Sequence, residues 1–359
     1  MRATRALCAV LALGVTGIAQ AQGPTPVTVG YTVPESPAFT FLGISPTKVS
    51  RASNARDLGI ALLNSVDSTG SLLTGVALAA TVWTLLPDVN IGPDKYRTDW
   101  KAYALANSQL SLGTVRASGD SGDTDIAIGF RTTFLDRSDP MQSATFVKEL
   151  TDSLKKCLED APPLIQPGGP NSSVDADSTN AAVQCGLRAD GVLRRKWNRK
   201  NWNKPALSWG GGMGWRVPGS RFGNMDHLGL STWLVGSLPV GGGSQFVGQL
   251  QYDHRARRDT LRETDVLTFG GRVTRGAASR NLFVEVVGTQ RLNTVPGISR
   301  SNVQWSGGVE LQLAPDYWLS TGFGKRYTQQ GEADRMVLIA NLRWGITSQS
   351  RFKLVQPQP

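Results

Sequence analysis

Apolar and polar side chains alternate along much of this 359-residue chain, most clearly in its second half. Between residues 302 and 313, Val303, Trp305 and Leu311 share one parity, whereas Ser306 and Glu310 share the other. A period of two is typical of a β-strand with two unlike faces. The pattern predicts strands at 57–64, 71–80, 103–115, 123–134, 206–216, 226–238, 244–254, 264–274, 281–289, 302–313, 316–326 and 335–346.

These strands fit a membrane-spanning barrel better than a soluble sandwich, although the strands of a sandwich also alternate. The residues that alternate with the apolar ones are small and polar, and many are glycines. The loops alternate between short and long, as in outer-membrane barrels. We therefore expect an all-β protein, an antiparallel transmembrane β-barrel of about 12 strands, with a range of about 10–14. Aromatic side chains stand near strand ends on the apolar parity, as in the girdles of such barrels; they are Tyr317, Trp305, Trp344, Trp209 and Trp215.

Segment 135–204 interrupts the strands and is expected to be partly helical. Ser138-Asp-Pro140 is typical of a helix start, and an apolar stripe at helical spacing follows it. Cys157 and Cys185 form an even pair in what we expect to be an oxidising compartment, which predicts one disulfide. The strand count puts this insert on the periplasmic side, as a plug inside the barrel or as an appendage. A count wrong by one strand would make it an outer cap.

The two ends of the chain are expected to lie outside the barrel, which occupies 57–346. Residues 1–21 are interpreted as a secretory signal peptide, because a basic start and an apolar run precede the cleavage site at Ala19-Gln-Ala21. Segment 22–56 is expected to be an extended arm, and 347–359 a C-terminal tail. After the cleavage site no apolar run reaches the roughly 18 residues of a membrane-spanning helix. The net charge of +10 suits nucleic acid or anionic lipid, and export argues against nucleic acid.

Over residues 57–346 these features together resemble the β-barrel proteins of Gram-negative outer membranes. The Val-Pro-Glu-Ser-Pro-Ala-Phe segment at 33–39 is similar to the opening of an uncharacterised family of such barrels. The resemblance implies an outer-membrane location after cleavage behind Ala21. It also implies contact with lipid and lipopolysaccharide, and with the barrel-assembly machinery during biogenesis. It supplies no catalytic residues, no cofactor and no oligomeric state.

Candidate chemistry centres on two Asp-His pairs, because the chain lacks a nucleophile elbow, a phosphate-binding loop and a zinc-protease motif. A hairpin symmetric about Val240 would place His227 opposite Asp253, and Asp226 opposite His254. A His–Asp dyad at the rim could activate water as a general base. We favour an ion pair that holds the strand register, with metal binding and catalysis as the alternatives, and we expect no metal or cofactor.

Charged residues of both signs fall on the polar parity of the strands. An arginine facing lipid at the bilayer midplane would cost about 2–4 kcal/mol, so these side chains are expected to line the lumen. They could favour anions in a pore, or simply neutralise one another, as Arg272 and Glu285 would on neighbouring strands. The lumen-lining set is Arg131, Arg216, Arg272, Glu285, Glu310 and Arg343.

A basic loop follows His254 and is expected at the outer surface. Arginine binds phosphate through a planar fork, so lipopolysaccharide phosphates are its natural partners, and a merely solvated loop is the alternative. The lipopolysaccharide-facing residues would be Arg255, Arg257, Arg258 and Arg262.

Three functions remain open from the sequence. The first is a passive channel or transport-type barrel for small solutes, partly plugged in one version. The second is a structural or adhesive barrel that binds lipopolysaccharide or a surface partner. The third, which we rank last because we expect no enzyme here, is a rim hydrolase that uses His227 and Asp253.

Overall fold

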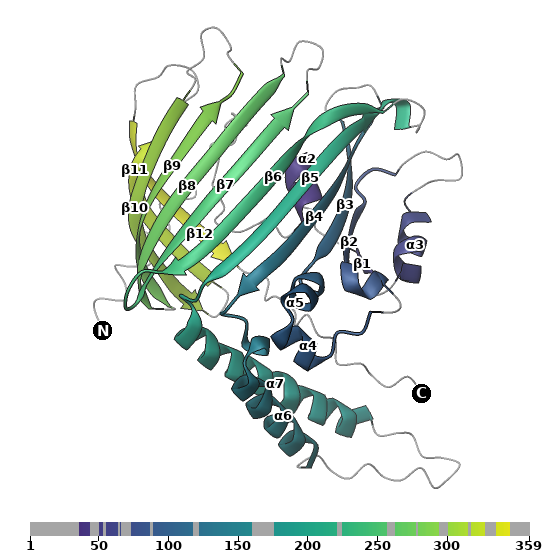
Figure 1. Ribbon diagram of the computed structural model, residues 1–359, viewed down its shortest axis with the longest axis vertical. Coiled ribbons are helices and arrows are strands. Elements are labelled where there is room, and N and C mark those ends of the chain that lie inside the picture. The colour runs from purple at the N-terminus through teal and green to yellow at the C-terminus, as the bar shows by residue number, and fades with distance from the viewer. Residues whose placement is uncertain are drawn as a thin grey trace, which may run out of the picture.

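One sheet organises the chain, and its strands pair in sequence order from β1 to β12 (Figure 1). Strand β1 runs parallel to β2, and every later pair of neighbours is antiparallel, so the predicted antiparallel β architecture is confirmed. The computed structural model describes residues 36–43, 50–52, 55–63, 65, 73–86, 89–117, 122–159, 176–220, 225–256, 263–277, 279–293, 301–314, 317–326 and 335–344.

The strands lengthen after β3, and from β4 onward each has ten to fourteen residues. Their bounds are β1 Ser50–Ala52, β2 Ala77–Thr81, β3 Gln109–Arg116, β4 Thr124–Asp136, β5 Ala206–Val217, β6 Asp226–Pro239, β7 Ser244–Arg255, β8 Thr264–Ala277, β9 Arg280–Arg291, β10 Ser301–Ala314, β11 Tyr317–Arg326 and β12 Arg335–Trp344.

The helices are mostly short and lie around the sheet, and two longer ones project from one end of it (Figure 1). None of the described helices is long and apolar enough to cross a membrane. The α-helices are α2 Pro37–Leu42, α3 Ala55–Leu63, α4 Pro93–Thr98, α5 Trp100–Ala106, α6 Ala144–Glu159 and α7 Ala176–Asn201. The 3-10 turns are η1 Val82–Leu85, η2 Pro140–Gln142 and η3 Pro218–Ser220.

The sheet has two chemically different faces, as its alternation predicts. In β10, Val303 and Trp305 share one face and are 56% and 41% exposed, whereas Glu310 lies on the other face and is 7% exposed. The register extends this division across the sheet, since Trp305 lies opposite Val286 of β9. We call the face with Trp305 the outer face and the face with Glu310 the inner face. The sheet curls, and α2 lies on its inner side (Figure 1).

Several boundaries expected near the N-terminus are wrong. Residues 57–63 of the strand predicted over 57–64 lie in helix α3 instead, where Leu58 and Leu62 are four residues apart and share one helix face. The stretch 103–115 starts inside α5, and its strand begins only at Gln109. The segment expected to be an extended arm contains α2 and β1. From residue 123 onward, the predicted strands are confirmed to within a few residues.

Residues 1–21 and 347–359 lie outside the described part of the chain, so the signal peptide and the tail stay predictions. Among the described strands, β12 pairs with β11, and a pairing of β12 with β1 is not among the ladders formed. Closure of the sheet into a barrel, and the number of strands in that barrel, therefore also stay predictions.

Candidate functional site

Helix α2 lies on the inner side of the sheet. It forms because its short sequence carries a start signal and a stop signal. Ser36 has the extended conformation of a helix N-cap, and Pro37 occupies the first turn, where its missing N–H costs nothing. Gly43 ends the helix in the left-handed conformation, with φ of 70°, and its N–H reaches the carbonyls of Phe39 and Thr40. These caps define a helix of six residues.

Helix α2 packs closely against β3, β4 and β5 because glycines clear the space beneath it. The backbone N–H of Ala38 donates to Oγ of Ser111 at 3.2 Å. A Cβ at Gly129 would overlap the backbone of Ala38, and one at Gly214 would overlap the ring of Phe41. Phe41 is 3% exposed, and Phe39, which packs with it in the same cluster, is also buried. The inner face is therefore shaped to hold this helix.

Arg255, at the end of β7, connects that strand to helix α2. Its Nη2 donates to the carbonyl of Phe41 at 3.1 Å, and its guanidinium carbon lies 4.1 Å from the centre of the Phe41 ring. The expectation that Arg255 faces lipopolysaccharide is therefore wrong, because its position shares the inner face with Gly229, its partner in β6. The other members of that basic set, Arg257, Arg258 and Arg262, lie outside the described residues.

Charged side chains on the inner face pair with one another. Arg216 of β5 makes a two-pronged contact with Asp125 of β4, at 2.6 and 2.8 Å. Arg272 of β8 lies 2.8 Å from Glu310 and 3.9 Å from Glu285, so the expected neighbour is the more distant of its two carboxylates. All these groups are at least four-fifths buried. The inner face thus holds charge in compensated clusters, as the neutralising interpretation predicts.

The two remaining members of the lumen set lie at inner-face positions of other strands or other parts of β4. Arg131 lies in β4, opposite Gln109 of β3 and Gly210 of β5. Arg343 lies in β12, opposite Trp318 of β11, and its side chain is outside the described part. The sequence placed both on the polar parity but gave no means of saying which strands would bring them a partner.

The predicted pairing of histidines with aspartates is wrong. The β6–β7 hairpin is centred on Gly242 and not on Val240, since Pro239 lies opposite Gln245. Asp253 therefore lies opposite Ser231, whose hydroxyl donates to it, and not opposite His227. The inner-face dyad of the rim-hydrolase hypothesis does not form.

His254 lies on the outer face, opposite Leu230. The ring of His227 stacks against that of His254, with centres 6.1 Å apart and planes inclined by 23°. Asp226 does not reach His254 as expected, because it lies opposite Arg216 of β5. Sequence reasoning missed this arrangement because it depends on the centre of one glycine-rich turn.

The insert 135–204 projects from the end of the sheet as a helical hairpin of α6 and α7 (Figure 1), so a plug inside the curve of the sheet is wrong. The predicted disulfide joins Cys157 to Cys185, with Cα atoms 5.7 Å apart. At the base of the hairpin, Nε1 of Trp197 donates to the carbonyl of Ser138 at 2.7 Å.

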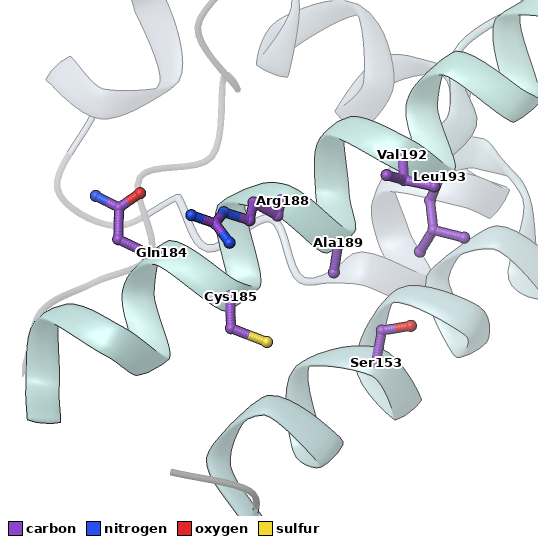
Figure 2. A pocket seen from close by; sticks show the side chains of 7 residues that line it. All are labelled: Ser153, Gln184, Cys185, Arg188, Ala189, Val192 and Leu193. Atoms are coloured by element: carbon purple, nitrogen blue, oxygen red, sulfur yellow. The ribbon is translucent and has the colours of Figure 1, made fainter.

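An open cavity of about 600 Å³ lies between the two helices of the hairpin, and Figure 2 shows the side chains around it. Apolar groups dominate its walls, and Arg188 is its one charged lining residue. The lining residues are Ser153, Gln184, Cys185, Arg188, Ala189, Val192 and Leu193. This cavity brings no catalytic or metal-binding combination together.

Comparison with known proteins gives little. No family model matches the chain, and no curated protein matches it. Among solved structures, the NanC porin in a rhombohedral crystal form is similar at a TM-score of 0.32 and 7% sequence identity. The alignment covers 67% of this chain and 95% of that one. A likeness at this level carries no argument about function.

Proposed function

We propose that the sheet closes into a β-barrel in the outer membrane of a Gram-negative bacterium, and that its outer face contacts the acyl chains. The carrying observation is the division between the two faces. Leu282, Val284 and Val303 are between 56% and 62% exposed on the outer face, whereas Arg272 and Glu310 pair on the inner face. In water such a continuous apolar surface is unfavourable, whereas a bilayer requires it.

Closure follows from the same environment. An open sheet edge in lipid would leave backbone N–H and C=O groups without partners, at several kcal/mol each, so a spanning sheet has to close. The export signal proposed at residues 1–21 would bring the chain to this compartment. The hairpin of α6 and α7 projects from the end of the sheet that also carries the short β6–β7 turn (Figure 1). Because short turns face the periplasm in such barrels, the proposed barrel has this hairpin on its periplasmic side.

Within this barrel, the inner face forms a passive pathway for small solutes that helix α2 narrows. The support is that α2 rests against β3, β4 and β5 and is tied to β7 through Arg255, so it reaches across part of the interior. The paired charges of the inner face favour polar solutes over apolar ones without a strong preference for either sign of charge.

Single-channel recording tests this function. The full chain is purified in folded form and inserted into planar lipid bilayers, and heat-dependent gel mobility confirms the fold before each recording. A narrowed channel gives small, reproducible current steps. An absence of current from an intact, folded sample contradicts the channel.

A second candidate is a barrel with a filled interior that serves a structural or adhesive role at the lipopolysaccharide surface. A group of inner-face side chains favours it, because Ser231, Trp233, Gln249 and Thr268 are all below 7% exposed. Such burial is typical of a packed core and unusual for the wall of a wide pore. The same recordings separate the two candidates, since a filled barrel conducts nothing even after α2 is loosened.

A further inference from the structure

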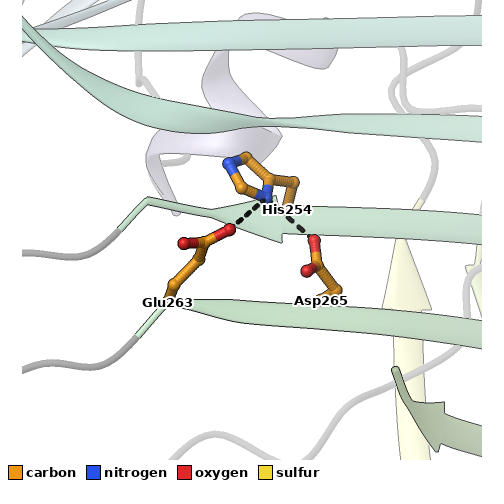
Figure 3. Close-up of side chains that lie close together, drawn as sticks. All are labelled: His254, Glu263 and Asp265. Atoms are coloured by element: carbon orange, nitrogen blue, oxygen red, sulfur yellow. Dashed lines mark hydrogen bonds and ion pairs between the residues drawn. The ribbon is translucent and has the colours of Figure 1, made fainter. Parts of the chain in front are cut away.

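The outer face carries a group of metal-binding side chains where β7 ends and β8 begins. His254, Glu263 and Asp265 converge there, and Figure 3 shows both carboxylates turned toward the imidazole. Nδ1 of His254 lies 2.8 Å from Oδ1 of Asp265 and 3.9 Å from Oε1 of Glu263. One possible ligand atom from each residue lies within 4.8 Å of the other two.

This spacing fits a divalent cation after small movements of two side chains. Metal–nitrogen and metal–oxygen bonds of about 2.0–2.2 Å put neighbouring ligand atoms roughly 3–3.5 Å apart in a tetrahedral site. His254 and Asp265 already approach more closely than that, so an ion would separate them slightly. Glu263 is 53% exposed and can turn inward at little cost, whereas Asp265 is only 15% exposed and is held in place.

Two neighbouring side chains, Tyr252 and His227, hold the ligand side chains of the cluster in place. Tyr252 donates its hydroxyl to Oδ1 of Asp265 at 2.8 Å, which restricts the carboxylate as outer-shell partners of metal ligands do. The exposed ring of His227 stacks on that of His254, so both histidines of the chain meet at this one place. A simple ion pair needs one carboxylate for one imidazole, and this site has two carboxylates.

We propose that His254, Glu263 and Asp265 bind a divalent transition-metal ion of the zinc class at the outer rim of the sheet. Mixed imidazole and carboxylate ligands suit such ions, whereas calcium and magnesium prefer oxygen alone. Three protein ligands leave further coordination positions of the ion open to solvent, where water or an anionic oxygen can bind. This site is on the face opposite to α2, so it does not depend on the channel function.

Calorimetric titration of the folded full chain in detergent with zinc chloride, and separately with calcium chloride, tests the site. One zinc ion binds per chain, and calcium binds at least tenfold more weakly. His254→Ala and Glu263→Gln each weaken zinc binding at least tenfold. Glu263→Gln keeps the size of an exposed side chain, so it remains informative if removal of the imidazole disturbs folding.

Asp253→Asn is the matched control, because Asp253 adjoins His254 in sequence but lies on the inner face, where Ser231 and Gln251 donate to it. Its zinc affinity equals that of the unmodified chain. The proposal is overturned if the unmodified chain binds no zinc, if calcium binds as tightly as zinc, or if Glu263→Gln and His254→Ala leave zinc binding unchanged.

Discussion

Replacement of Phe41 by alanine should release helix α2 from the inner face and increase conductance. The ring of Phe41 is 3% exposed, it covers Gly214, and the guanidinium of Arg255 lies 4.1 Å above it. Truncation of a buried phenylalanine costs about 3–5 kcal/mol. The stacked arginine contributes roughly 0.5–2 kcal/mol of that amount. The cost falls on the docked state of α2 alone, because the free helix exposes the ring to water.

This cost strongly shifts the equilibrium between the docked and the released helix. At about 1.4 kcal/mol for each tenfold change, the ratio of released to docked helix rises roughly a hundredfold to several thousandfold. A helix of six residues has little stability of its own, so its docking depends on a few contacts of this kind. The hydrogen bond from the guanidinium of Arg255 to the main-chain carbonyl of residue 41 survives the substitution and limits the effect.

The assay is single-channel recording of folded Phe41→Ala beside the unmodified chain. We expect larger or longer-lived open states in the variant. Phe323→Ala is the matched control, because it removes the same ring from the outer face, where Phe323 is 56% exposed, and should leave the current steps unchanged. Identical conductance in the unmodified chain and the Phe41 variant, with the fold verified, would refute the role of α2 as a constriction.

Three further outcomes follow from named contacts. Glu310→Gln removes the nearer of the two carboxylates that pair with Arg272. Stability should fall by up to about 3–5 kcal/mol, seen as thermal unfolding at a lower temperature, and reversal potentials should shift toward anion preference. Trp305→Arg, on the outer face, should cost more folding free energy in lipid vesicles than the same change at Ser306, by about 2–4 kcal/mol if the site lies near the midplane. Cys157→Ser removes the disulfide to Cys185, which closes a loop with a sequence separation of 28, and should destabilise the hairpin by about 3–4 kcal/mol. Trypsin should then cleave the hairpin, while the sheet stays resistant.

The strands from β4 to β12 could be predicted because each separates two environments over ten or more residues. One side of β10, for example, carries Val303 and Trp305, and the other carries Ser306 and Glu310. Over eight residues the same signal is ambiguous, and the strand predicted over 57–64 falls largely in the helix Ala55–Leu63. A short segment with leucines four residues apart fits either structure.

Helix α2 escaped prediction although its caps are visible in the sequence. Ser36-Pro37 and Gly43 are typical start and stop signals, but six residues contain too few turns for an apolar stripe to be recognised. The glycines at 129 and 214 are a second signal, because glycine inside a strand often marks the close approach of another backbone. What they receive could not be predicted, since it comes from a segment far away in the sequence.

The histidine site depended on register, which the sequence specifies only weakly at the turn. Residues Val240 to Gly243 include three consecutive glycines, which permit several turn geometries. A shift of the turn centre by two residues places Asp253 opposite Ser231 and not opposite His227. The pairing of His254 with Asp265 belongs to the separate β7–β8 ladder. The predicted partners of both histidines are therefore wrong.

The contact of the outer face with lipid is the claim on which the account depends, and spin labels along β10 test it most directly. Single labels at successive positions from 303 to 311, in chains folded into lipid vesicles, are compared for collision with oxygen and with a water-soluble nickel complex. We predict that oxygen accessibility alternates with a period of two and is highest at the odd positions, which include Trp305 and Val309. Equal accessibility at odd and even positions, or odd positions that collide more with nickel than with oxygen, would contradict the account.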